Sequence, residues 1–349
     1  MPDVDLAAPT YYMNRELSWL EFNHRVLYQG RLQEVPLLER VKFMSIVSSN
    51  LDEFFMIRVA GLKQVLETGR PVRDKAGMTP DQQLEAIAER THRMAREQTE
   101  AFAEIRKRLD REDFHILPDG GLSAKQGKYV DRYFEAELRP LLTTLAVDRL
   151  DPFPVIPGLT LNLGVALTPR GQAEPEEGPS IAVVPIPGNL PRFLTLPADS
   201  GLHVLPLEDV VKRNLHHLFP DFDILGTVIF RLTRDGDVPI DEDSAGDLLK
   251  TVEQAVHNRR RRSVVRLEVS ADPDEHVMHW LRDWTEVKDR DIYEIGGLLD
   301  LADTMSLATR PGFNHLKIPD WPPQPPADLV GREGTIWEQI QEGDALLVH

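Results

Sequence analysis

PLLERVKFMSIVSSNLDEFFMIR, residues 36–58, decides the fold of the N-terminal part of the chain. Its apolar residues recur at spacings of three and four, which is the pattern of a helix with one apolar face. The stripe continues beyond the quoted stretch and comprises Leu37, Val41, Met44, Leu51, Phe55, Leu62 and Val65. Ser48 and Arg58 occupy gaps in this stripe. The stretch therefore predicts a long helix that starts near Pro36.

Helical segments flank this stretch on both sides, and together they cover residues 14–117. Thr79 to Gln82 supplies the start of the last segment, with an N-cap threonine, a proline at the first helical position and a glutamine at capping-box spacing. Apolar residues then recur helically at Leu84, Ile87, Met94, Phe102, Ile105 and Leu109. Since three antiparallel helices form the simplest bundle, residues 1–117 are expected to be an all-α three-helix bundle like a spectrin repeat.

The sequence pattern changes after Asp119-Gly120-Gly121. A helix is predicted from Ser123 to about Leu145, and residues 159–168 then alternate between apolar and polar or small side chains, as a strand does. Further strands are predicted at 181–186, 192–196, 227–233 and 264–269, and further helices at 208–218, 244–257, 274–284 and 299–307. Because strands precede and interleave with helices, residues 118–318 are expected to form an α+β head domain with a mixed sheet.

Proline-rich sequence follows the head domain. Five prolines lie between Pro319 and Pro326, so residues 319–327 are expected to be a linker. Residues 328–349 contain a short helical piece, Thr335 to Gln341, and an apolar run, Ala345 to Val348, that reads as a buried strand. Two dozen residues cannot build a core, so we expect these to be the start of a truncated C-terminal domain, cut by design or by nature.

Composition narrows the function classes. The 349 residues carry a net charge of −17, which argues against nucleic acid or an anionic membrane as the main partner. The charge is uneven, because residues 1–115 contain 17 basic and 19 acidic side chains. There is no cysteine, and therefore no disulfide, thiolate metal site or thiol nucleophile. No signal sequence and no apolar run of about 18 residues is found, so we expect a cytoplasmic protein without a membrane span.

Ser48 to Arg58 is the most informative local sequence. Ser49 with Asp52, and Asn50 with Glu53, have capping-box spacing, which suggests that the long helix is interrupted and restarts after Asn50. The N–H groups exposed there, beside an amide that donates and accepts, would suit a purine edge or a phosphate. The structural alternative is that Asn50 caps a kink while Arg58 neutralises Asp52 or Glu53 inside the bundle.

Other candidate motifs carry less information. Gly121 to Lys128 has the wrong spacing for a P-loop. The basic run Arg259 to Arg262 follows a predicted helix, so it either complements the helix dipole or binds an anion. His276 and His279 could share a helix face, but further metal ligands cannot be placed. No Ser-His-Asp set is distinguishable among 11 histidines.

Three segments taken in order closely resemble the N-terminal domain of the long, ATP-dependent polyphosphate kinases. They are Tyr12 to Asn23, Pro36 to Phe43 and Ser49 to Phe55. Ile186 to Phe193 and Leu298 to Leu301 are similar to the head domain of that family. Gly343 to His349 is similar to the entry into its first catalytic domain. The resemblance thus covers the whole chain but about half of a family member.

The resemblance implies an enzyme that reversibly transfers the γ-phosphate of ATP to polyphosphate through a phosphohistidine, with Mg²⁺, on phospholipase-D-like C-terminal domains. The residues for that chemistry would lie beyond residue 349, so no residue here inherits a catalytic or metal role, His349 included. This chain alone is therefore expected to be inactive.

What the resemblance carries over is Asn50, which matches the ATP-contacting asparagine of the family. Asp52, Glu53 and Arg58 are expected to support it rather than to bind ligand. The resemblance further implies that the bundle roofs the nucleotide site and that the head domain forms a homodimer. The alternative from another class is a stand-alone, non-catalytic adaptor or anion-binding protein with the same fold.

Overall fold

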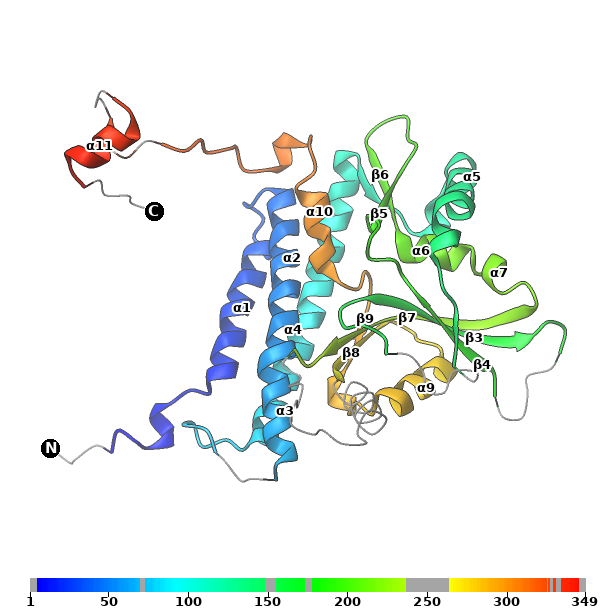
Figure 1. Cartoon of the computed structure of the whole chain (residues 1–349), viewed down its shortest axis with the longest axis horizontal. Coiled ribbons are helices and arrows are strands. Elements are labelled where there is room, and N and C mark those ends of the chain that lie inside the picture. The colour runs from blue at the N-terminus through cyan, green and yellow to red at the C-terminus, as the bar shows by residue number, and fades with distance from the viewer. Residues whose placement is uncertain are drawn as a thin grey trace, which may run out of the picture.

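The computed structural model describes residues 5–69, 73–147, 155–172, 178–236, 264–324, 326, 329–330 and 334–344. Up to residue 112 its N-terminal part is an all-α bundle, as predicted, but residues 114–116, which were expected to belong to the bundle, form a strand that pairs with the head domain. The helices are α1 (Arg15–Arg31), α2 (Leu37–Glu53), α3 (Ala60–Glu67) and α4 (Pro80–Leu109). A π-helix, η2 (Phe54–Val59), joins α2 to α3 into one continuous segment. α1, α2 and α4 lie side by side (Figure 1).

The start of α4 confirms the prediction from its capping residues. The hydroxyl of Thr79 accepts a hydrogen bond from the Gln82 backbone N–H at 3.3 Å, and the Gln82 side chain accepts one from the Thr79 N–H at 2.9 Å. Pro80 occupies the first helical position, where its missing N–H costs nothing. Leu84, Ile87 and Met94 are buried in the bundle core, as their spacing indicates.

The described residues form two sheets, which lie in the head domain except for β1, a strand contributed by the end of the N-terminal part. The larger has six strands in the order β2-β4-β3-β7-β8-β9, and the smaller has the order β1-β6-β5. The strands are β1 (Phe114–Ile116), β2 (Leu145–Ala146), β3 (Leu161–Pro169), β4 (Ser180–Pro185), β5 (Phe193–Leu196), β6 (Leu202–Pro206), β7 (Phe222–Arg234), β8 (Val264–Ser270) and β9 (Ile292–Ile295). β1 with β6 and β8 with β9 are parallel pairs, and the other pairs are antiparallel. The predicted α+β fold with a mixed sheet is confirmed.

Helices cover both faces of the six-stranded sheet. Leu163 and Val165 of β3 pack into a core with α5 (Ala124–Tyr133) and α6 (Leu207–Arg213). Ala166 of the same strand packs into the opposite core, beneath α9 (Glu275–Thr285). A Cβ at Gly164 would lie 2.6 Å from a methyl group of Val277, so glycine at this position allows α9 to approach closely. β3 is therefore a central strand with two buried faces.

Three helix predictions for the head domain need correction. The helix from Ser123 ends at Tyr133 and is followed by π-helix η5 (Phe134–Leu138) and 3₁₀-helix η6 (Arg139–Leu141), in which Pro140 has no N–H to donate to a continuing helix. The segment 208–218 is two helices, α6 and α7 (Leu215–Leu218). They are separated at Asn214, whose side-chain amide donates a hydrogen bond to the Val210 carbonyl oxygen.

The third correction concerns residues 299–307, predicted as one helix. Asp300 adopts a left-handed conformation with φ +50°, so the chain begins as the 3₁₀-helix η9 (Leu301–Thr304) before α10 (Met305–Ala308). This segment packs back on the bundle, where the Ser45 hydroxyl of α2 donates to the Ala302 carbonyl oxygen at 2.6 Å. A part of the chain distant in sequence thus covers α2.

The C-terminal segment contains one described helix, α11 (Ile336–Glu342), where a short helical piece was predicted, and Thr335 caps its N-terminus. Figure 1 shows it standing apart from the bundle and the head. The predicted helix 244–257, the basic run Arg259 to Arg262 and the strand Ala345 to Val348 lie outside the described residues. None of the helices that the structure describes is both long and apolar enough to span a membrane.

Candidate functional site

Asn50 lies near the C-terminal end of α2 and faces α1. Its side-chain Nδ2 donates a hydrogen bond to Oδ1 of Asn23 at 3.0 Å. Asn23 is fully buried and in turn donates to the Val47 carbonyl oxygen at 3.2 Å. Asn50 is itself half-buried, and no described residue bonds its Oδ1. The asparagine pair therefore fixes the Asn50 amide while leaving its oxygen and one N–H available.

The predicted restart of the helix after Asn50 is wrong. α2 runs through Asn50 without interruption, and the Phe54 N–H bonds the carbonyl oxygens of Asn50 and Leu51. The irregularity begins only at Phe54, as the π-helix η2. Phe54 stacks on Trp19 of α1 at 4.7 Å between ring centroids, so aromatic packing fixes this part of the segment. Asn50 is thus neither a helix cap nor beside free N–H groups.

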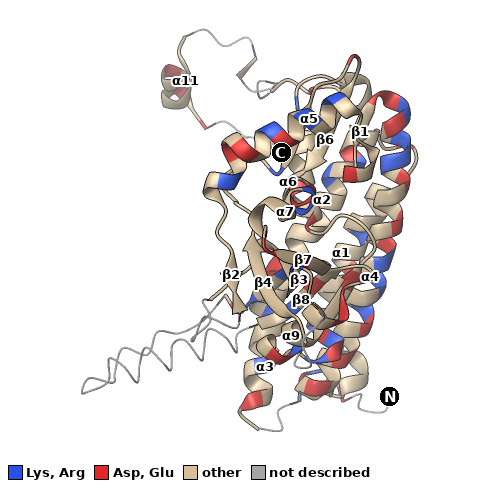
Figure 2. Ribbon diagram, turned by 90° about the vertical axis from the view of Figure 1, so that its right-hand side faces the viewer, with Lys and Arg blue, Asp and Glu red and all other residues tan. Residues whose placement is uncertain are grey.

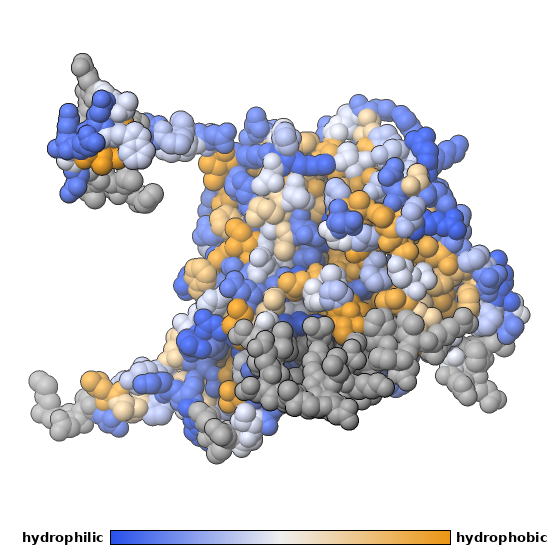
Figure 3. Space-filling view, viewed as in Figure 1, coloured by the Kyte–Doolittle hydropathy of each residue, from blue (hydrophilic) through white to orange (hydrophobic). Residues whose placement is uncertain are grey.

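Exposed apolar side chains flank Asn50 on the outer face of this segment. Ile46 precedes Asn50 by four residues and Ile57 follows it by seven, and both are exposed, as is Phe22 beside Asn23. A spacing of four places Ile46 and Asn50 on one face of α2, and Ile57 lies in the π-helix that continues it. Apolar and polar surface alternate over α1 and α2 (Figure 3). An amide beside apolar side chains can form hydrogen bonds with the polar edge of a flat ring that packs on those side chains.

Arg58 does not pair with Asp52 or Glu53. Its guanidinium lies 3.6 Å from the carboxylate of Glu16 in α1, on the same side of the bundle as the asparagine pair. Glu16 is buried and is also paired with Arg15 at 2.6 Å. Glu53 is exposed. Arg58 thus ties η2 to α1, which supports the surface around Asn50.

Asp52 points to the opposite side, into the head domain. Arg231 of β7 donates to both of its carboxylate oxygens, at 2.8 and 2.5 Å, and Arg266 of β8 bonds it as well. Glu268 lies 3.0 Å and Asp300 3.4 Å from the Arg231 guanidinium. All five residues, which we call the Asp52 cluster, have side chains almost fully shielded from solvent. The cluster joins α2 to the head two residues after Asn50.

The charges of the Asp52 cluster are unequal, with two arginines against three carboxylates. Burial by itself would raise the pKa of Asp52, but the hydrogen bond from Arg231 and the charge of Arg266 hold this pKa below its usual value. Burial raises the pKa of Asp300 to about 6, against the opposing charges of Arg231 and Arg192. Asp52 is therefore the ionised centre of the cluster.

The other sequence candidates do not assemble into a site. His279 pairs with Asp283 at 3.3 Å on an exposed face of α9. Among the residues that the structure describes, no three histidine, aspartate or glutamate side chains are grouped to hold a metal ion. Lys and Arg alternate with Asp and Glu along α4, so this helix is no basic track for a polyanion (Figure 2).

Asn23 is the residue that sequence reasoning missed. It is buried although polar, and it occurs in the helical stripe Leu20, Asn23, Leu27. A polar residue within such a stripe is the signal that could have identified it as a buried partner.

Comparisons with known proteins agree on one family. Residues 12–117 match the family described as polyphosphate kinase N-terminal domain, and residues 125–307 match polyphosphate kinase middle domain. The chain is 41% identical over 352 residues to a polyphosphate kinase of Bacillus cereus, covering 99% of this chain and 50% of that protein. It is 42% identical over 331 residues to one of Thermosynechococcus vestitus, covering 93% and 44%.

A solved structure shows the same fold. The crystal structure of polyphosphate kinase from Porphyromonas gingivalis matches with a TM-score of 0.74 at 24% identity, covering 92% of this chain and 44% of that one. The chain spans about half the length of the relatives that it matches.

Proposed function

This chain belongs to the polyphosphate kinase family, and we propose that it is the half that roofs the nucleotide site of an enzyme transferring the γ-phosphate of ATP reversibly to inorganic polyphosphate. The observation that supports this is the coverage of the relatives. The Bacillus cereus protein matches 99% of this chain, but the match spans only 50% of that protein. We assign the phosphohistidine and the residues that bind Mg²⁺ to the other half, in keeping with the family that the sequence resembles.

The residue of this half that we assign to contact with the nucleotide is Asn50. Asn23 holds the Asn50 amide in one orientation, because Nδ2 donates to Asn23 Oδ1. The free Oδ1 accepts from the exocyclic amino group of adenine, and the second N–H donates to a ring nitrogen, which is the bidentate pairing that asparagine makes with adenine. Ile46 and Ile57 supply apolar contact beside it. Arg58 and Asp52 position the segment from either side.

Magnesium would neutralise charge on the transferring phosphoryl group when it is bound. The described residues offer no grouped set of oxygen or nitrogen ligands for it. No residue that the structure describes is therefore assigned to the metal, and the role of this half is to orient the base.

Residues 1–349 alone are expected to show no polyphosphate kinase activity, because we assign the phosphohistidine that accepts the phosphoryl group to the other half of the enzyme. The measurement is incubation of the purified chain with ATP, Mg²⁺ and a polyphosphate primer. ADP formation coupled to growth of the primer, persisting through a second, unrelated purification, would contradict this and require a nucleophile within these residues.

Dimerisation through the head domain is the second part of the proposal. β7 pairs with β8 only from Phe230 to Arg234, so its first half has no strand partner on that side among the described residues. Ile224 and Leu225 lie in this half and are exposed. An unpaired strand edge that carries exposed apolar side chains is a surface on which a second copy can pair.

Sedimentation of the chain over a concentration series is expected to show a monomer–dimer equilibrium. Leu225→Lys should raise the dissociation constant about tenfold or more, because it places a charge in the contact. Lys125→Leu, on the exposed side of α5, is the matched control and should change it by less than about threefold. A strict monomer at every concentration would contradict dimerisation through the head.

A further inference from the structure

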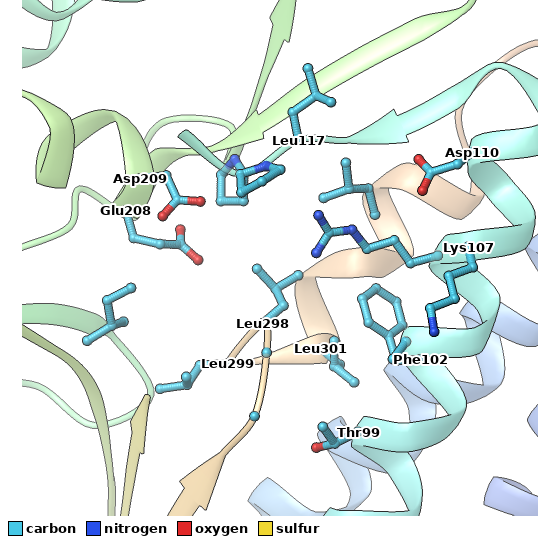
Figure 4. Close-up of a pocket in the computed structure, with 18 residues that line it drawn as sticks. Thr99, Phe102, Lys107, Asp110, Leu117, Glu208, Asp209, Leu298, Leu299 and Leu301 are labelled. Atoms are coloured by element: carbon cyan, nitrogen blue, oxygen red, sulfur yellow. The ribbon is translucent and has the colours of Figure 1, made fainter. Parts of the chain in front are cut away.

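A cavity of about 430 Å³ lies between α4 of the bundle and the head domain. Phe102 of α4 lines one wall, and Leu298 and Leu299 of the head line another (Figure 4). The volume falls within the range of sites that bind small organic molecules. Neither Asn50 nor Asn23 lines it, so it is separate from the site proposed above.

Charged groups stand at opposite ends of this cavity. Lys107 lies at the α4 end and Asp209 at the far end, with Leu298 between them (Figure 4). Arg106 is a further lining residue from α4. The α4 end of the cavity therefore carries two cations and the carboxylate of Asp110, the middle is apolar, and the far end carries the carboxylates of Glu208 and Asp209 (Figure 4).

The charged side chains that line the cavity differ in whether another residue neutralises them. Glu208 is occupied by Arg192 at 2.7 Å, and Asp110 by His115 at 3.1 Å. By contrast, the side chains of Arg106, Lys107 and Asp209 form no hydrogen bond or ion pair with the residues that the structure describes. Burial, with the charge of Glu208 adding to it, raises the pKa of Asp209 to about 6, against Lys212 and Arg106. Asp209 is half-buried and accepts no hydrogen bond from a described residue, so its carboxylate is available to accept from a ligand.

The backbone leaves room for a ligand at the edge of the cavity. Gly296 and Gly297 precede Leu298, and both line the space. A Cβ placed at Gly297 would meet no atom within 4 Å, so this part of the wall is open. A planar ligand could therefore lie against the backbone at Gly297 without displacing a side chain.

We infer that this cavity binds a small aromatic anion that carries hydrogen-bond donors at the end opposite to its charge. Arg106 and Lys107 would bind the anionic group, Phe102 and Leu298 would pack on the ring, and Asp209 would accept from the donors. Guanosine 5′-monophosphate has all three features, because the N1–H and N2–H groups of guanine can donate to one carboxylate. It is therefore the probe that we choose.

The test is titration of guanosine 5′-monophosphate into the whole chain by isothermal calorimetry. Saturable binding of one molecule per chain is expected. Guanosine lacks the anion and ribose 5-phosphate lacks the ring and donors, so each should bind at least about tenfold more weakly. Failure of guanosine 5′-monophosphate to saturate at millimolar concentration, or equally tight binding of tripolyphosphate, would overturn the inference.

Substitutions on α4 and at Asp209 test whether the probe binds in this cavity. Arg106→Gln and Asp209→Asn should each weaken the probe about tenfold or more, since each removes a charge-assisted hydrogen bond. Arg108→Gln removes the same charge from the same helix but does not line the cavity, and it should change affinity by less than about twofold. Ala103→Phe, which fills the cavity from α4, should abolish binding in a chain whose melting temperature shows that it is folded. Affinity unchanged in Arg106→Gln, or lost equally in Arg108→Gln, would contradict the site.

Discussion

Replacement of Arg231 by methionine is expected to lower the free energy of unfolding by about 3 to 5 kcal/mol, the loss that follows when one partner of a buried ion pair is removed. Arg231 donates to both oxygens of Asp52 and also pairs with Glu268 and Asp300. Without it, the buried carboxylates of Asp52 and Glu268 would face Arg266 alone, and Asp300 would be left with the charge of Arg192. Denaturation by urea at neutral pH, followed by circular dichroism, measures the loss.

Two further variants test whether the loss of stability comes from the ion pairs of Arg231 or from removing any arginine of this region. Arg231→Lys keeps the charge but not the planar guanidinium group, so its free energy of unfolding should lie between those of the wild type and Arg231→Met. Arg58→Met removes the other arginine near Asn50, whose pair with Glu16 is partly exposed, and should cost no more than about 1 kcal/mol. Equal losses in Arg231→Met and Arg58→Met would contradict the central role of the Asp52 cluster.

Acid should reduce the difference between Arg231→Met and the wild type. Because the folded pKa of Asp52 is lowered, its stabilisation is present above the unfolded pKa of about 3.9 and is lost as the pH falls through the folded pKa. In the variant, unpaired buried carboxylates would have raised pKa values and would gain stability on protonation. The two unfolding free energies should therefore converge below about pH 4.

Local signals in the sequence explain why the helical bundle and the central strand could be predicted. The capping box at Thr79 and the helical stripe after it involve residues three and four apart, so they are visible in one segment. The alternation in β3 is local in the same way. The strands β1, β6 and β9 are short and exist through pairing with distant segments, and they were not predicted.

The surroundings of Asn50 were predictable only in part. The resemblance singled out Asn50, but its partner Asn23 is 27 residues away. The partners of Asp52 are farther still, since Arg231 is 179 and Arg266 is 214 residues beyond it. Spacing favoured Arg58 as the neighbour of Asp52, because it considers only residues within a few turns. Such long-range ion pairs follow from tertiary packing, which also keeps α2 continuous through Asn50.

Asn50→Asp is expected to weaken ATP binding in a complete enzyme about 5- to 150-fold, which corresponds to about 1 to 3 kcal/mol. The substitution removes the amide donor and adds a negative charge beside a polyphosphate ligand. It also loses the hydrogen bond to Asn23 Oδ1, a loss of about 1 kcal/mol in stability. The effect on ATP should exceed what this change in stability explains.

The most direct measurement is the KM for ATP of a chimera in which this chain replaces the matching half of the Bacillus cereus polyphosphate kinase, to which it is 41% identical. Glu53→Gln is the matched control, because Glu53 is exposed on the same segment and the substitution also changes one charge. Asn50→Asp is expected to raise KM for ATP at least about fivefold, while Glu53→Gln leaves it within about twofold and both chimeras melt near the parent. A chimera that synthesises polyphosphate with the same KM for ATP in all three forms would contradict the assignment of Asn50 to the nucleotide site.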